Sequence, residues 1–223
     1  MPRMGRIVVR DYPHHVTQRG NYKNIVFTNK SDYERYLAWL NIYSQKYGLL
    51  FLTYSLMPNH VHFIAIPTKD NSMAKTFNTC HMIYSQYFNK KKNACGHLWQ
   101  GRFYSNALDE NHLYAAVRYI ENNPVRAGLV AAPEDWEWSS ARHHLTGNNP
   151  GLNLLDFSKY MEIDNWRDYL AEPDDADVIK NFKANTLTGR PLGSDTFVDK
   201  IETMFDRTLK SARRGRPKKV TEK

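Results

Sequence analysis

Met57-Pro58-Asn59-His60-Val61-His62-Phe63-Ile64 lies between two apolar runs that are rich in strand-forming residues. Its Pro-Asn pair is a turn signal, so the stretch predicts a β-hairpin whose second strand begins at His60. Side chains two positions apart on a strand point to the same face of a sheet, so His60 and His62 project side by side. Two neighbouring imidazoles suit a divalent metal ion, although surface or hydrogen-bonded histidines on a strand give the same pattern.

Residues 110–124 form a second stretch with matching chemistry. Apolar side chains recur there at helical spacing, which predicts an amphipathic helix that Pro124 should end. Tyr119 and Asn123 are four positions apart and therefore share one side of that helix. The amide oxygen of Asn123 is then a candidate third metal ligand, and Tyr119, one turn earlier, is a candidate nucleophile.

Both stretches resemble parts of a known family. Residues 57–64 and 118–130 closely resemble the single-tyrosine HUH transposases, which are IS200-like. Together with residues 13–21 and 98–103, they resemble the subgroup of REP-associated tyrosine transposases. The motifs occur in the same order as in that subgroup, and the resemblance extends over residues 1–147.

The resemblance implies a fold, a reaction and a cofactor. The fold would be α+β, an HUH endonuclease core with a ferredoxin-like (RRM-like) antiparallel sheet covered by helices. His60, His62 and Asn123 would bind Mg²⁺ or Mn²⁺, and Tyr119 would attack single-stranded hairpin DNA of a palindromic repeat to form a 5′-phosphotyrosine. The phosphodiester energy is then kept in the covalent bond. That agrees with the absence of a GxxxxGK[ST] nucleotide-binding loop.

Charge is distributed unevenly along the 223 residues, whose net charge is +8. Residues 1–130 carry 16 Lys and Arg against 7 Asp and Glu, residues 131–206 carry 7 against 15, and residues 207–223 carry 8 against 1. A basic first block favours a polyanion such as DNA as the partner, whereas the alternative is an ordinary solvated surface.

A Gly-Asn-Asn-Pro-Gly stretch at residues 147–151 is the clearest boundary signal in the chain. It predicts a catalytic domain over residues 1–147, an acidic helical appendage over 148–206 and a basic, disordered DNA-binding tail over 207–223. We hypothesise that the acidic part lies on the basic DNA groove and restrains it.

Within the first domain the pattern predicts the order strand, helix, strand, strand, helix, strand, helix. The first strand covers residues 15–19, a helix over 31–47 begins with a capping box and stops at Gly48, and a second helix covers 72–90. A further strand is expected over 97–108. This order fits an antiparallel sheet with helices on one face.

Basic side chains are the candidates for DNA contacts. Arg19, Arg102 and Arg126 are expected to contact the DNA backbone, with ordinary surface arginines as the alternative. In the tail, Arg214, Arg216 and Lys218 belong to an Arg-Gly-Arg-Pro stretch that is like the core of an AT-hook. Such a stretch enters a narrow minor groove, whereas a general basic tail binds any nucleic acid by counterion release.

Cellular context follows from composition. The two cysteines, Cys80 and Cys95, fit a reducing cytoplasm better than a disulfide scaffold. No apolar run approaches the roughly 20 residues of a membrane span, so we expect no membrane association. The active unit is expected to be a monomer or a homodimer.

Three other functions compete with a covalent DNA strand transferase. The first is a catalytically silent protein that binds repeat hairpins, and the second is a metal-dependent nuclease without a covalent intermediate. The third is an RNA-binding module with a similar sheet, in which the predicted metal ligands would have no function. Tyr84 and Tyr87 are rival nucleophiles, but neither is followed one turn later by an amide and a proline.

Overall fold

The structure is a computed structural model that describes residues 5–148 and 151–210. Its centre is a sheet with the strand order β2-β3-β1-β4 in which every neighbouring pair is antiparallel. The tail residues Arg214, Arg216 and Lys218 lie outside the described residues, so their DNA contacts stay predictions.

The four strands are β1 (His14–Arg19), β2 (Leu49–Met57), β3 (His60–Pro67) and β4 (Tyr104–Ala107). Helix α1 (Lys30–Tyr47) connects β1 to β2, and α2 (Ser72–Lys92) connects β3 to β4. This alternation and the strand order are those of a ferredoxin-like sheet. The predicted α+β class is confirmed, and β3 begins at His60 as the hairpin pattern predicted.

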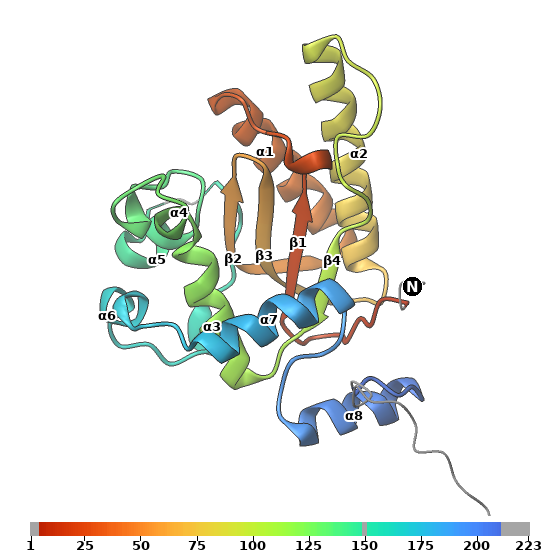
Figure 1. Ribbon diagram of the computed structural model, residues 1–223, viewed down its shortest axis with the longest axis vertical. Coiled ribbons are helices and arrows are strands. Elements are labelled where there is room, and N and C mark those ends of the chain that lie inside the picture. Colours follow the sequence, from red (N-terminus) through yellow and green to blue (C-terminus); the bar gives the residue numbers. More distant parts are fainter. Residues whose placement is uncertain (1–4, 149–150, 211–223) are drawn as a thin grey trace, which may run out of the picture.

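Helices cover both faces of the sheet (Figure 1). Helices α1 and α2 cover one face, and α3 (Glu110–Glu121) and α7 (Ala176–Thr188) cover the other. The prediction that helices cover one face is wrong because β2 and β3 are apolar on both sides and need cover on both. Val61 and Phe63 belong to one apolar cluster, whereas Ile64 and Ile66 belong to the other.

Helices α4 (Asn123–Arg126), α5 (Ala141–Thr146) and α6 (Trp166–Ala171) lie on the α3 face. Helix α8 (Asp195–Phe205) instead packs in a separate apolar cluster with Ile7 and Val9. The described residues also include three short 3-10 turns, η1 (Asn21–Lys23), η2 (Pro133–Asp135) and η3 (Phe157–Lys159). Phe182 and Leu192 are buried in the same cluster as Ile64 of β3 and Leu113 of α3. Residues 151–210 therefore complete the core of the sheet, and removing them would expose apolar side chains.

Two predicted element boundaries differ from the structure. The capping box placed the start of α1 at Ser31, but Asn29 is the N-cap and its side chain accepts a hydrogen bond from Asp32 N. The strand predicted over 97–108 is reduced to β4, because Gly96 and Gly101 adopt positive φ angles in the preceding loop, whose isolated bridge, at Trp99, is to Gly20 just after β1.

Gly48 is expected to be harder to replace than other glycines that end helices. It ends α1 with φ of 69°, and a Cβ there would lie 2.3 Å from Thr68 Oγ1. Gly147 ends α5 with φ of 73°, and a Cβ at this position would meet no atom within 4 Å among the described residues. Left-handed backbone alone costs about 1 kcal/mol, so we expect Gly147→Ala to lose about that much and Gly48→Ala about 2–3 kcal/mol. Urea unfolding of both variants measures the difference, and equal losses would contradict the steric argument.

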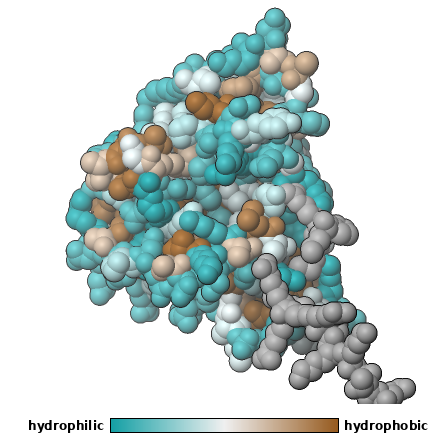
Figure 2. Space-filling model, in the orientation of Figure 1, coloured by the Kyte–Doolittle hydropathy of each residue, from teal (hydrophilic) through white to brown (hydrophobic). Residues whose placement is uncertain are grey.

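The molecular surface seen in Figure 2 is mainly hydrophilic, with small, separate hydrophobic areas, one of them over the end of α4. Across residues 5–148 and 151–210, no helix has both the length and the apolar character needed to cross a membrane.

Candidate active site

A cleft of about 810 Å³ opens on the face of the sheet that carries α3 and α7. The four residues singled out from the sequence, His60, His62, Tyr119 and Asn123, all line this cleft. They come from β3, α3 and α4. The structure thus brings two imidazoles, a phenol and an amide together at one end of the sheet.

The start of β3 positions the two imidazoles. His60 and His62 are two residues apart on the strand, and their ring centroids lie 4.9 Å apart with the rings nearly perpendicular. In the pairing with β1, Arg19 lies opposite His60 and Thr17 opposite His62. Paired residues of antiparallel strands share a face, so β1 adds a guanidinium and a hydroxyl to the same cleft.

Burial keeps both imidazoles neutral. It lowers the pKa of His60 to about 4, and the charge of Arg19 acts in the same direction. Burial also holds the pKa of His62 well below its ordinary value, helped by His60 and by His15. A neutral imidazole keeps a free nitrogen lone pair, which is the form that binds metal ions.

Tyr119 lies in an environment of aromatic rings and positive charge. Its ring centroid is 6.0 Å from that of His62 and 5.1 Å from that of Phe182. The Arg126 guanidinium lies 4.0 Å from the Tyr119 ring centroid, and Lys183 Nζ lies 5.5 Å from it. The Tyr119 ring therefore lies among two other rings and two basic side chains.

Asn123 does not lie on the same helix as Tyr119. Helix α3 ends at Glu121, and Asn123 begins the short helix α4 with Pro124 in its first turn. Proline suits the first turn of a helix because its missing N–H would have no partner there, so Pro124 starts α4 rather than stopping α3. Asn122 keeps nearly helical angles, which still brings Asn123 to the Tyr119 side.

Donor atoms in the cleft fit a divalent metal ion. His60 Nδ1 forms a hydrogen bond with Asn59 Oδ1 at 2.6 Å, and His62 Nδ1 forms one with His15 Nε2 at 2.9 Å. The Nε2 atoms of His60 and His62 therefore remain available for other partners. The Asn123 amide nitrogen is buried without a hydrogen-bond partner in the described residues, and a 180° rotation of this amide would exchange it for the oxygen. Within the described ranges no three His, Cys, Asp or Glu side chains gather, so a site would need this amide.

The predicted DNA-contacting arginines separate into two groups. Arg19 lines the cleft. The Arg126 guanidinium lies over the Tyr119 ring and also donates a hydrogen bond to the backbone carbonyl oxygen of Tyr119. Arg102 instead lines two other hollows beside Phe103. A loop replaces the first part of the expected strand, and Arg102, which lies in this loop, does not line the cleft.

The rival tyrosines lie away from the cleft. Tyr84 is fully buried under α1, on the opposite face of the sheet, and its hydroxyl donates to Val26 O at 2.6 Å. The Tyr87 hydroxyl donates to Asp32 Oδ1 at 2.9 Å. Both belong to the packing between α1 and α2.

Several residues of the cleft were missed by sequence reasoning. They are His15, Tyr22 and Tyr104 from the sheet side and Phe182, Lys183 and Thr186 from α7. His15 is on the same face of β1 as Thr17 and Arg19, a two-residue period that could have been noticed. Helix α7 offered no motif, and only its packing places it beside Tyr119.

Acidic residues before α7 pair with arginines near Tyr119. Asp174 lies 3.2 Å from Arg118 Nε and 3.4 Å from Arg126 Nη1, and Glu172 also pairs with Arg118. These contacts are consistent with the hypothesis that the acidic segment restrains the basic groove. Because Phe182 belongs to the core, deletion of the segment would not separate restraint from folding.

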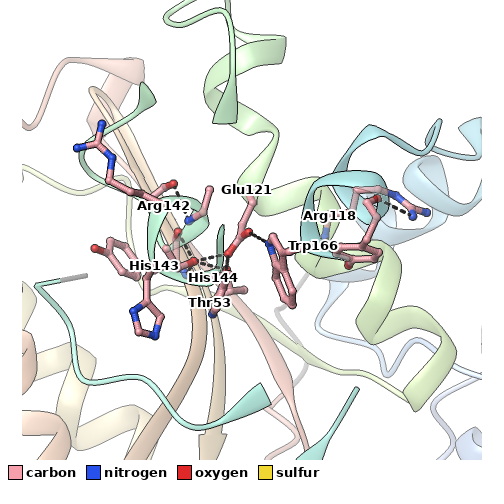
Figure 3. A network of polar contacts seen from close by, with 12 residues as sticks. Thr53, Arg118, Glu121, Arg142, His143, His144 and Trp166 are labelled. Carbon is pink, nitrogen blue, oxygen red and sulfur yellow. Dashed lines mark hydrogen bonds and ion pairs between the residues drawn. The ribbon is translucent and has the colours of Figure 1, made fainter. Parts of the chain in front are cut away.

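A buried carboxylate ties α3 to the rest of the molecule (Figure 3). Glu121 Oε1 accepts hydrogen bonds from Thr53 Oγ1 at 2.8 Å, Ser140 Oγ at 2.6 Å and His144 Nδ1 at 2.6 Å. Its Oε2 accepts one from Trp166 Nε1 at 2.8 Å. Glu121 is two residues from Tyr119, so this network fixes the end of the helix that carries the phenol.

Glu121→Ala is therefore expected to lower the free energy of unfolding by about 3–5 kcal/mol, because it leaves buried donors without an acceptor. Glu110→Ala, at the exposed start of the same helix, should cost less than about 1 kcal/mol. Urea unfolding of both variants is the measurement, and similar losses would show that the network contributes little.

The same carboxylate has a predictable pH dependence. Burial raises the pKa of Glu121, but His144 and the hydrogen bonds outweigh it, so the net pKa is lowered. Its stabilising contribution is present above the ordinary glutamate pKa and is lost as the pH falls below about 4. The difference between the wild type and Glu121→Gln should therefore shrink at acid pH.

Comparisons with known proteins agree with this geometry. The family model described as "Transposase IS200 like" matches residues 8–123. A Haemophilus influenzae protein named as a REP-associated tyrosine transposase is 28% identical over 118 residues, covering 44% of this chain and 67% of the relative. A solved structure of a REP-associated tyrosine transposase bound to a REP hairpin aligns with a TM-score of 0.52 at 21% identity, covering 73% of this chain and 99% of that one. At this identity the likeness shows the fold.

Proposed function

The chain belongs to the IS200-like transposase family, and from this premise we propose that it cuts and rejoins single-stranded hairpin DNA through a covalent bond to Tyr119. The observation that carries the proposal is the cleft that Tyr119 lines together with His60, His62 and Asn123. The names of the relative and of the hairpin-bound structure support the substrate class.

The cleft would hold one Mg²⁺ or Mn²⁺ ion. His60 and His62 would supply imidazole nitrogens and Asn123 an amide oxygen, a donor set with places left for phosphate oxygens. Such an ion, when bound, polarises a phosphate and neutralises the charge that builds during displacement.

Tyr119 would carry the bond exchange. Its phenolate oxygen attacks phosphorus, the bond from phosphorus to the 3′ oxygen breaks, and that oxygen takes up a proton. The products are a 5′-phosphotyrosine and a free 3′-OH, so no high-energy cofactor is consumed. Arg126 and Lys183 lie near the Tyr119 ring, where their positive charges would attract the phosphate backbone of the DNA.

The rim of the cleft suits a single strand. Arg19 and Lys23 line the cleft and are exposed, and Tyr22, which is 87% exposed, offers a ring on which an unpaired base could stack. Basic side chains would follow the backbone while aromatic faces accept bases. This combination favours single-stranded DNA over a duplex, whose bases are already stacked.

The test is denaturing gel analysis of a labelled hairpin with a single-stranded flank, incubated with the protein and Mn²⁺. We expect a protein–DNA band that survives denaturation with the hairpin and none when the flank is paired to a complementary strand. Cleavage without such a band would favour a non-covalent nuclease. Binding without cleavage, over a panel of repeat hairpins, would favour a catalytically silent binding protein.

A further inference from the structure

A line of buried hydrogen bonds runs from the cleft into α7. His62 Nδ1 lies 2.9 Å from His15 Nε2, and the two rings stack with centroids 5.1 Å apart. His15 Nδ1 in turn lies 2.9 Å from Thr186 Oγ1. All three side chains are buried, and they come from β3, β1 and α7.

The direction of each hydrogen bond follows from the Thr186 hydroxyl. Thr186 Oγ1 has one proton and lies 2.8 Å from Phe182 O, a carbonyl that can only accept, and 3.1 Å from the side-chain amide of Asn106. We assign this proton to the shorter bond, to Phe182 O, so toward His15 the hydroxyl accepts. His15 must then carry its proton on Nδ1, which leaves Nε2 without one.

This arrangement determines the tautomer of His62. Because His15 Nε2 has only a lone pair to offer, His62 Nδ1 must donate to it. The proton of the neutral His62 ring is then on Nδ1, and its Nε2 lone pair is free. His60 reaches the same tautomer by a shorter route, since its Nδ1 donates to the amide oxygen of Asn59 at 2.6 Å.

We propose that His15 and Thr186 are positioning residues that fix the Nδ1–H tautomer of His62 and so keep its Nε2 available as a metal ligand. Thr186 lies outside residues 8–123, the part matched by the family model. Helix α7 would then contribute a residue that positions a metal ligand, in addition to covering the sheet. The metal-binding half of this inference rests on the proposed function, whereas the tautomer is a property of the metal-free protein.

The experiment compares wild type, Thr186→Val and Thr186→Ser, with Thr188→Val as a control in the same helix. Thr188 is exposed and bonds only Asn185 O among the described residues. Long-range ¹H–¹⁵N spectra of the metal-free proteins report which ring nitrogen of His15 and His62 carries the proton. Titration with Mn²⁺, followed by electron paramagnetic resonance, reports metal affinity.

We expect both rings of the wild type to carry the proton on Nδ1. Thr186→Val should populate the Nε2–H form of His62 and weaken Mn²⁺ binding about tenfold, the usual scale for removing a partner of a ligand. Thr186→Ser and Thr188→Val should resemble the wild type. A role in packing alone would not change the tautomer, and serine, which lacks the methyl group, would then not restore it.

Two results would overturn the inference. One is a wild-type His62 with its proton on Nε2, and the other is a folded Thr186→Val protein with unchanged tautomers and Mn²⁺ affinity. If the wild type shows the expected tautomers but binds no Mn²⁺, the tautomer assignment stands and the proposed metal site fails. The two failures are therefore distinguishable.

Discussion

Tyr119→Phe is expected to abolish the protein–DNA band that survives denaturation, with a loss of cleavage rate of about 10⁴-fold or more. Phenylalanine keeps the ring that packs against Phe182 and His62 but lacks the oxygen that would bond phosphorus. The measurement is the initial rate of covalent product on a labelled hairpin with Mn²⁺. Binding of the uncut hairpin should change little, because the cationic rim of the cleft is untouched.

Tyr104→Phe is the matched control, since Tyr104 lines the same cleft from β4 and is half-buried. It should still form the covalent product. If Tyr119→Phe cuts as fast as the wild type while Tyr104→Phe does not, the nucleophile comes from β4. If neither variant differs from the wild type, cleavage proceeds without a tyrosine adduct and the non-covalent nuclease gains support.

Features that depend on neighbours in the sequence were predictable. The hairpin around Pro58-Asn59 set His60 and His62 on one face by the two-residue period of a strand, and β3 begins where that pattern placed it. The glycine that ends α1 was equally local. Patterns of this kind depend only on residues that are close in the sequence, so a single sequence is enough to identify them.

Features that depend on distant segments were not predictable from one sequence. Nothing near Thr186 indicates that it bonds a histidine 171 positions earlier, because the contact exists only after α7 packs on β1 and β4. The one-face prediction overlooked that β2 and β3 are apolar on both sides, but even this pattern does not indicate which segment supplies the second layer. Residues 97–103 were predicted as part of a strand because alternation of side chains does not reveal a positive φ at glycine.

Removal of one proposed metal ligand is the second change with a large expected effect. His62→Ala should lower the rate of covalent product by about 10³-fold or more, because a bound ion contributes several kcal/mol of charge stabilisation. A chelator should have the same effect on the wild type. His97→Ala, which removes an exposed histidine beside a different hollow, should leave the rate unchanged.

Asn123 gives the sharpest test of that site, because its buried amide nitrogen has no partner among the residues that the structure describes and only its oxygen can bind a cation. Asn123→Asp keeps an oxygen donor of nearly the same shape, so it should retain Mn²⁺ binding, whereas Asn123→Ala should lose it. Both variants remove the orphaned nitrogen, so a purely structural role would make them behave alike. Calorimetric titration with Mn²⁺ separates these outcomes without any DNA present. Equal Mn²⁺ affinity in wild type, Asn123→Ala and His62→Ala would mean that the ion binds elsewhere and that the cleft works without it.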